Sequence, residues 1–200
     1  LHITDEIIDE LKSNNINIEE LTLHVGAGTF RPVKSETIDE HEMHTEHFIV
    51  NKKTIDALLA NIDNIISVGT TAVRTLESLY WIGVKIISNS NISVNELSIS
   101  QWEAYQLNQE IDVKDALKAI IAFLDKNELE KLITSTQIMI YPGYKFKIIS
   151  GMVTNFHQPK STLLLLIAAF IGDDWKNVYK YALENDFRFL SYGDSSILLR

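Results

Sequence analysis

The chain has 200 residues, 46% of them hydrophobic, and a formal net charge of −9 at pH 7. This length fits one domain with a substantial core, and the negative charge argues against a free-standing nucleic-acid binder, whose affinity depends on neutralising phosphates. The chain has no cysteine, which excludes disulfides, thiolate catalysis and cysteine-bound iron–sulfur clusters, and which favours a cytoplasmic protein. The longest apolar run, residues 163–171, is too short for a membrane span, so we expect no membrane partner.

Hydrophobic periodicity predicts alternating helices and strands along the chain. We expect helices at 4–14, at 55–62, from 70 onward, and at 113–124, 161–171 and 174–183. We expect strands at 21–25, 40–50, 65–68, 84–87, 138–141, 145–149, 152–155 and 187–190. This alternation predicts an α/β fold, specifically a layered α/β/α sandwich with a mixed, mostly parallel sheet, in a single domain over residues 1–200.

The sequence GAGTFRPV, which follows the first apolar strand, predicts a binding loop. Gly26 and Gly28 allow close backbone approach, and Pro32 fixes the exit of the loop. Arg31 is therefore expected on a shaped loop, where a guanidinium suits an anion or a ribose.

Three histidines and three glutamates occupy the eight positions that begin at Glu40. If this segment is a strand, His44 and Glu46 share one face, whereas His41 and His47 point to the other. That separation argues against a compact three-histidine site, and we predict no metal. His44 with Glu46 suits general acid/base catalysis, because the reference pKa of histidine is about 6.5, and a purely structural histidine is the alternative.

The sequence VGTTAVRTLES predicts a strand, a glycine turn and a helix start in succession. The backbone N–H groups and the helix dipole at Thr70 and Thr71 suit a carboxylate or a phosphate. The alternative is that one of these threonines only caps the helix. Arg74 and Glu77, three residues apart, are by default a surface ion pair.

A third unusual stretch covers residues 141–162. Its Tyr-Pro-Gly-Tyr sequence predicts a turn with aromatic walls, and Asn155, His157, Ser161 and Thr162 surround a proline bend before a helix. Such a group suits a base or a ribose. A hairpin turn followed by a capped helix explains the Pro-Gly and Ser-Thr pairs but not the Asn-Phe-His.

Seven blocks follow one another along the chain: LHITDEIIDEL, LHVGAGTFRPV, EHEMHTEHFIV, VGTTAVRTLES, YPGYKFK, VTNFHQPKSTLLLL and FRFLSYGDSSILL. In this order they resemble the S-adenosylmethionine:tRNA ribosyltransferase-isomerases of queuosine biosynthesis. The resemblance implies that the ribosyl moiety of S-adenosylmethionine is transferred to 7-aminomethyl-7-deazaguanine in tRNA and isomerised, giving epoxyqueuosine-tRNA with release of adenine and methionine. It implies S-adenosylmethionine as a co-substrate without a further cofactor, the modified tRNA as a partner, and a monomer in full-length form.

The resemblance also implies roles for individual residues. Acid or base roles fall to His44, Glu46 and His157. The implied substrate-binding residues are Gly26, Gly28, Phe30, Arg31, Thr70, Thr71, Arg74, Tyr141, Asn155, Ser161 and Thr162. Among them, Phe30 and Tyr141 are expected to stack on a base, and the threonines and arginines to hold the methionine carboxylate or the ribose.

Known family members begin upstream and carry a β-rich insert domain, so the resemblance implies that this chain is the C-terminal catalytic lobe of a larger enzyme. Segment 82–135 is longer than the connector expected between the Gly-Thr-Thr and Tyr-Pro-Gly blocks. We predict that the glycine loop, the Thr70–Thr71 helix start and the Asn155–Thr162 bend converge on one cleft, because open α/β sheets bind ligands at strand ends.

Two alternatives stay open. A methyltransferase is one, because LTLHVGAGTF looks like a strand entering a Gly-x-Gly turn. Against it, His24 stands where an acid is expected, and no helical pattern follows. The other alternative is a non-catalytic scaffold that docks tRNA.

Overall fold

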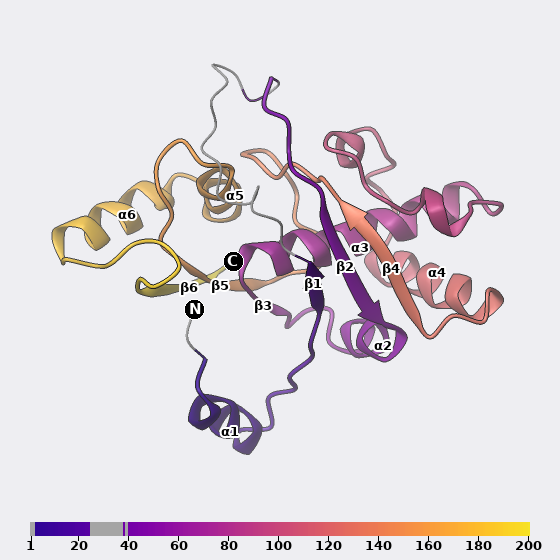
Figure 1. Cartoon of the computed structure of the whole chain (residues 1–200), viewed down its shortest axis with the longest axis horizontal. Coiled ribbons are helices and arrows are strands. Elements are labelled where there is room, and N and C mark those ends of the chain that lie inside the picture. The colour runs from indigo at the N-terminus through magenta and orange to yellow at the C-terminus, as the bar shows by residue number, and fades with distance from the viewer. Residues whose placement is uncertain (1–2, 25–37, 39) are drawn as a thin grey trace.

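The computed structural model describes residues 3–24, 38 and 40–200. Within these ranges the elements are α1 (Asp5–Ser13), β1 (Thr22–His24), β2 (Glu46–Asn51), α2 (Lys52–Ala60), β3 (Ile66–Val68), α3 (Thr70–Ser88), the short 3₁₀ helices η2 (Val94–Glu96) and η3 (Glu103–Tyr105), α4 (Val113–Lys126), β4 (Lys131–Thr136), β5 (Gly151–Asn155), α5 (Thr162–Ile171), α6 (Asp174–Glu184) and β6 (Ser195–Leu199) (Figure 1). No helix in the described ranges is long and apolar enough to cross a membrane.

The strands form two small sheets. One has the order β1–β2–β4 with both pairings antiparallel, and the other has the order β3–β5–β6. In the second sheet, β3 pairs with β5 in parallel and β5 pairs with β6 antiparallel. The mixed α/β class is confirmed.

The predicted mostly parallel sheet is wrong, because three of the four pairings between these strands are antiparallel. A strand–helix–strand alternation favours a parallel sheet only when successive strands join the same sheet. Here α3 and α4 connect β3 to β4, which belong to different sheets. The strands therefore do not form the single layered α/β/α sandwich that the sequence predicts.

Helix α3 is the core of the molecule. It packs on α4 and contacts strands of both sheets, and its residues from Val73 to Val84 are buried (Figure 1). Gly83 allows the close approach of α4, since a Cβ atom there would lie 2.2 Å from the carbonyl oxygen of Ala116. The strand predicted at 84–87 is wrong, because these residues continue α3, whose packing on α4 overrides the β-propensity of valine and isoleucine.

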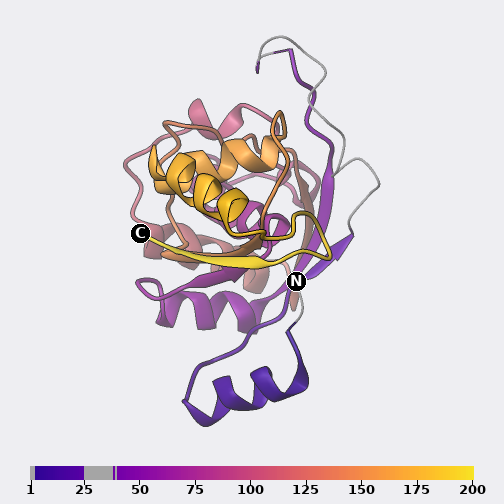
Figure 2. The same cartoon turned by 90° about the vertical axis from the view of Figure 1, so that its left-hand side faces the viewer.

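The remaining helices lie at the periphery. Figure 2 shows α5 and α6 together on one side of the β3–β5–β6 sheet, and α1 set apart from the other elements. None of the residues of α1 is buried, although Thr4 caps its first turn by accepting a hydrogen bond from the N–H of Ile7. The helices predicted at 113–124, 161–171 and 174–183 are confirmed within three residues at each end.

Three further predicted strands, 138–141, 145–149 and 187–190, are wrong, and the sequence analysis missed β4 and β6. In the first two segments side chains supply several of the backbone hydrogen bonds that a neighbouring strand would make. The carboxylate of Glu77 accepts hydrogen bonds from the N–H groups of residues 147–149, and Arg74 donates to the carbonyl of Ile138. Extended, buried segments therefore need not be strands.

Candidate functional site

The carboxyl ends of β3 and β5 lie side by side, and two of the predicted binding segments begin there. Val68 pairs with Val153, and the N–H of Gly69 donates to the carbonyl of Val153 at 2.9 Å. Gly69 has a φ of 91°, a conformation that suits glycine and lets α3 begin at once. The start of α3 and Asn155, the last residue of β5, therefore share one edge of the sheet.

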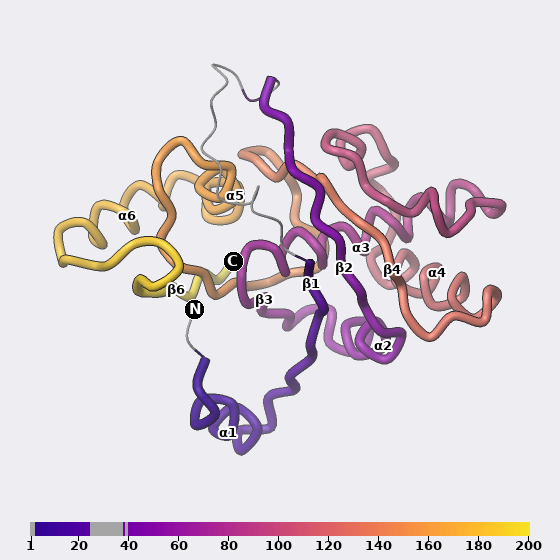
Figure 3. Tube along the Cα trace, viewed as in Figure 1, coloured from indigo at the N-terminus to yellow at the C-terminus, as the bar shows by residue number. Residues whose placement is uncertain are grey.

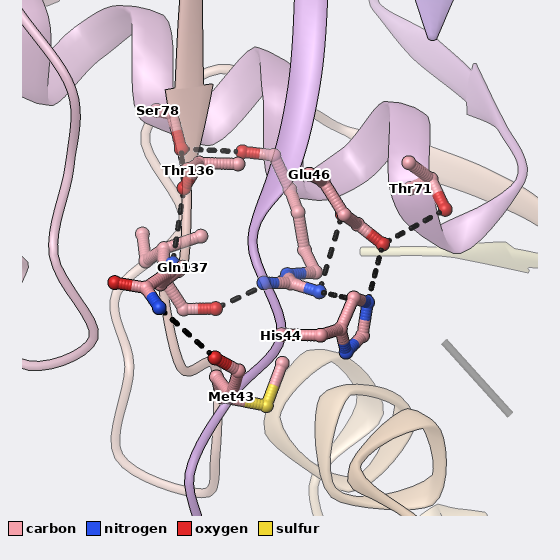
Figure 4. A network of polar contacts seen from close by, with 9 residues as sticks. Met43, His44, Glu46, Thr71, Ser78, Thr136 and Gln137 are labelled. Atoms are coloured by element: carbon pink, nitrogen blue, oxygen red, sulfur yellow. Dashed lines mark hydrogen bonds and ion pairs between the residues drawn. The ribbon is translucent and has the colours of Figure 1, made fainter. Parts of the chain in front are cut away.

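Glu46 is the centre of a polar cluster that joins β2 to this edge (Figure 4). Its residue surface is only 1% exposed. The Nε2 atom of His44 lies 2.9 Å from Glu46 Oε1, and the Thr71 hydroxyl donates to the same oxygen at 3.4 Å. Arg74 Nη1 lies 3.2 Å from the other oxygen, Oε2. One carboxylate thus links His44 to two residues of α3.

The contacts of His44 determine its tautomer. Its Nε2 atom lies near both Glu46 Oε1 at 2.9 Å and Arg74 Nη1 at 3.4 Å. The guanidinium can only donate, and the contact to the carboxylate is the shorter one, so the distances favour a proton on Nε2. In the neutral ring Nδ1 is then the basic atom, and within the described part of the chain it makes no hydrogen bond. A buried carboxylate that orients an imidazole in this way is the arrangement of a general base.

Arg74 is 3% exposed and extends from α3 between Glu46 and the carbonyl of Ile138. Burial lowers the pKa of the guanidinium, and the charge of Glu46 opposes that shift. Its Nη2 atom has no hydrogen-bond partner among the described residues. An unpaired buried donor is costly, so this nitrogen is a candidate contact for a substrate oxygen.

The predicted surface pair between Arg74 and Glu77 is wrong, because both residues are buried and their partners differ. Glu77 is 0% exposed and accepts hydrogen bonds from three backbone N–H groups and from the Tyr144 hydroxyl, at 2.8 to 3.1 Å. Burial raises the pKa of Glu77, and these donated hydrogen bonds oppose the shift. Glu77 thereby fixes the segment that follows the Tyr-Pro-Gly-Tyr turn.

Asn155 connects β5 to the loop that precedes β6. Its Nδ2 donates to the carbonyls of Gly193 and Asp194 at 3.0 and 3.2 Å. Arg188 and Asp194 close this loop, since the carboxylate of Asp194 accepts from both the backbone N–H and the guanidinium of Arg188 at 2.8 Å. Asn155 therefore holds this loop against the end of β5.

His157 lies beyond β5. Its ring Nε2 is 2.9 Å from the Thr154 hydroxyl, and its backbone N–H donates to the Tyr179 hydroxyl. Burial lowers the pKa of His157 to about 4. The ring is thus neutral at pH 7, which favours a hydrogen-bonding or base role over an acid role.

A side chain of the predicted binding segments caps α5, but none caps α3. Ser161 accepts from the N–H of Leu164 and so caps α5, with Thr162 as the first helical residue. The N-cap of α3 is Gly69, without a side-chain capping bond, so neither Thr70 nor Thr71 caps that helix.

Tyr141 lies against other aromatic rings, with ring centroids 5.9 Å from Trp102 and 5.2 Å from Tyr105.

Four predicted substrate-binding residues, Gly26, Gly28, Phe30 and Arg31, fall outside the described residues. In the described ranges no group of three or more histidine, aspartate or glutamate side chains is arranged to hold a metal ion. Gln101 and Gln137, whose contacts with residues 41–43 lie beside the cluster, were not predicted from the sequence.

Comparisons with known proteins agree with one another. The family described as "Queuosine biosynthesis protein" matches residues 1–198. The S-adenosylmethionine:tRNA ribosyltransferase-isomerases of Halothermothrix orenii and Caldanaerobacter subterraneus are 36% and 37% identical to the chain, cover all of it, and are themselves covered over 47% of their length. The crystal structure of S-adenosylmethionine tRNA ribosyltransferase from Thermotoga maritima superposes with a TM-score of 0.59 at 30% identity, over 98% of this chain and 50% of that one. The chain thus spans about half the length of the relatives it matches.

Proposed function

The chain belongs to the queuosine biosynthesis protein family, and on that basis we propose that it is the catalytic lobe of an S-adenosylmethionine:tRNA ribosyltransferase-isomerase. The reaction transfers the ribosyl moiety of S-adenosylmethionine to 7-aminomethyl-7-deazaguanine in tRNA and rearranges it to the epoxide of epoxyqueuosine. Adenine and methionine leave. Relatives that carry the enzyme's name over the full length of this chain support this assignment.

The observation that carries the mechanism is the 2.9 Å contact between His44 Nε2 and the buried carboxylate of Glu46. The first chemical step removes a proton from the 5′ carbon beside the sulfonium. In our proposal His44 Nδ1 accepts that proton, and the electron pair stays on the carbon, stabilised by the neighbouring positive sulfur. Glu46 orients the ring, and its carboxylate lies beside the imidazolium that forms when the proton is accepted.

The other polar groups at this edge are proposed to bind substrate. Arg74, whose buried Nη2 has no hydrogen-bond partner among the described residues, is proposed to bind an oxygen of the ribose or of the methionine carboxylate. Thr70, Thr71 and the start of α3 favour an anion through the helix dipole. Asn155 and Tyr141 are proposed to contact the ribose and a base, and Arg31 with its glycine loop stays a prediction outside the described residues.

His157 is proposed as an auxiliary base rather than as the acid that protonates adenine, because its ring is neutral at pH 7. Ser161 is committed to capping α5, so a substrate contact by Ser161 or Thr162 would have to come from the helix start as a whole. We propose S-adenosylmethionine as a co-substrate without a further cofactor or metal, tRNA as the macromolecular partner, and a cytoplasmic, monomeric enzyme.

The test is to incubate the native protein that contains this chain with S-adenosylmethionine and tRNA bearing the deazaguanine, and to follow the products by chromatography. The proposal predicts free adenine and methionine in equal amounts. Release of S-adenosylhomocysteine would instead support the methyltransferase alternative. A protein that binds no S-adenosylmethionine would support the scaffold alternative.

A further inference from the structure

Among the residues that the structure describes, the backbone just before β2, which carries His44, pairs with no strand. Strand β2 begins at Glu46, and the register of its pairing with β4 also begins there, with Glu46 opposite Thr136. His44 therefore sits on an irregular segment. Its ring must nevertheless stay within hydrogen-bond distance of Glu46, so another interaction has to fix this backbone.

Two glutamine side chains hydrogen-bond to the backbone of the segment that precedes His44, at His41 and Met43. Gln101 Nε2 donates to the carbonyl of His41 at 2.6 Å, and Gln101 Oε1 accepts from the N–H of Met43 at 2.9 Å. Gln137 Nε2 donates to the carbonyl of Met43 at 3.1 Å, as Figure 4 shows. Side-chain amides thus supply the hydrogen bonds that a neighbouring strand supplies farther along β2. Gln137 directly follows Thr136, so it extends the β2–β4 ladder by one side chain.

We propose that Gln101 and Gln137 are positioning residues that hold His44 in line with Glu46, a role that rests on the proposed function of His44. Met43 is only 2% exposed, so its burial adds to the two glutamines in fixing the backbone directly before His44. The His44 side chain is 19% exposed, and its Nε2 lies 2.9 Å from Glu46 Oε1, so a fixed backbone before His44 helps to keep the ring at this distance. A base that is placed before substrate arrives loses no catalytic efficiency to reorientation.

The proposal also gives a role to the connector between α3 and α4. Residues 89–112, at the right of Figure 3, pass β4, where Ile99 forms a parallel bridge with Thr136. The N–H groups of Gln137 and Met139 donate to the carbonyls of Ile99 and Gln101 at 2.8 and 3.0 Å. The connector is therefore anchored on the same backbone that carries Gln137, and it delivers Gln101 to the segment before His44.

The first test uses the native protein that contains this chain without any substrate. Nitrogen-15 spectra of the imidazole rings at pH 8 should show His44 as the Nε2–H tautomer, with its signals identified by their loss in His44→Gln. Gln101→Leu and Gln137→Leu should each shift these signals toward the averaged values of a free imidazole. The matched control is Gln109→Leu, which removes two side-chain to backbone hydrogen bonds in the same connector, at 2.7 and 3.1 Å, but none to residues 41–43. Unchanged signals in both variants would overturn the proposal.

The second test is a double-mutant cycle on adenine release. Gln101→Leu should lower kcat by roughly 10- to 100-fold with KM nearly unchanged, as expected when a catalytic group is misplaced by about 1 Å. In a His44→Gln background the same substitution should cost nothing further, because its effect acts through His44. Independent, multiplying losses would show a merely structural role and contradict the proposal. If the unmodified protein releases no adenine, the proposed function fails, while the nitrogen spectra still decide the positioning role.

Discussion

Arg74 is a buried cation whose compensating charge comes from Glu46, 3.2 Å away. Removing one partner of such a pair leaves the other charge buried and unpaired, which costs about 3–5 kcal/mol. We therefore expect Arg74→Met to lower the free energy of unfolding by about that amount. The double variant Arg74→Met/Glu46→Leu should lose less than the sum of the two single variants, since it leaves no unpaired charge.

Urea denaturation checks this expectation. Lys180→Met is the matched control, because it breaks an exposed pair with Glu184 at 3.8 Å and should leave stability nearly unchanged. If Arg74→Met resembled the control, the buried carboxylate of Glu46 would not depend on Arg74 for a compensating charge, and the expectation would be wrong.

The lowered pKa of His157 predicts how the free energy of unfolding depends on pH. Burial lowers its pKa in the folded protein to about 4, whereas an unfolded histidine titrates near 6.5. Between these values the unfolded chain binds a proton that the folded protein does not, so the contribution is fully present above pH 6.5 and is lost as pH falls toward 4. The difference corresponds to roughly 3 kcal/mol at most.

The measurement is the free energy of unfolding between pH 4 and pH 8 for the wild type and for His157→Gln. The variant should show a shallower fall with acid, because glutamine does not titrate. Parallel curves for the two proteins would mean that His157 titrates alike in both states and would refute the lowered pKa.

At the scale of elements, Glu77 joins α3 to the segment after the Tyr-Pro-Gly-Tyr turn. Four donors converge on its two oxygens. Glu77→Gln replaces one oxygen by an amide donor that faces other donors, so we expect a loss of about 2–5 kcal/mol, typical of buried donors left without an acceptor. Differential hydrogen exchange should place the loss at residues 147–149. The exposed substitution Glu184→Gln is the control, and equal protection of 147–149 in both variants would contradict the anchoring role.

The long, periodic helices were predictable because their apolar stripes repeat over several turns. Helix α4, with Leu117, Ile120 and Leu124 buried on one face, is a clear example. The errors arose where partners distant in sequence decide the structure. Nothing local reveals that the backbone of 147–149 binds Glu77, or that residues 84–87 continue a helix because α4 covers Gly83.

The candidate site was predictable in its residues but not in their arrangement. Strand alternation placed His44 and Glu46 on one face, and the two side chains do meet, although the segment before Glu46 is not a strand. Helical spacing predicts a surface partner for Arg74, whereas the fold buries this residue against Glu46, 28 positions earlier in the chain. Gln101 carries no local signal at all, because its role depends on a connector folding back on residues 41–43.

At the scale of the molecule, the site lies where the two sheets meet across α3. Glu46 and His44 come from the β1–β2–β4 side, Asn155 ends a strand of the other sheet, and Thr71 and Arg74 come from the helix between them. Both sheets and α3 must therefore be in place before the base, its carboxylate and the neighbouring donors can act together. The chain spans about half the length of its relatives, so activity belongs to experiments on the native protein that contains it.

The most direct test of this account is the exchange of label from S-adenosylmethionine deuterated at the 5′ carbon, measured per folded molecule of that native protein. The wild type should wash out the label, and His44→Gln and Glu46→Gln should each slow the washout by roughly 100-fold or more. In the double variant the two losses should not multiply, because removing either residue disables the pair. His47→Gln, an exposed substitution on the same strand, should exchange at the wild-type rate. If His44→Gln and Glu46→Gln both exchange the label as fast as the wild type, neither residue takes part in removing the proton from carbon, and the proposed mechanism is wrong.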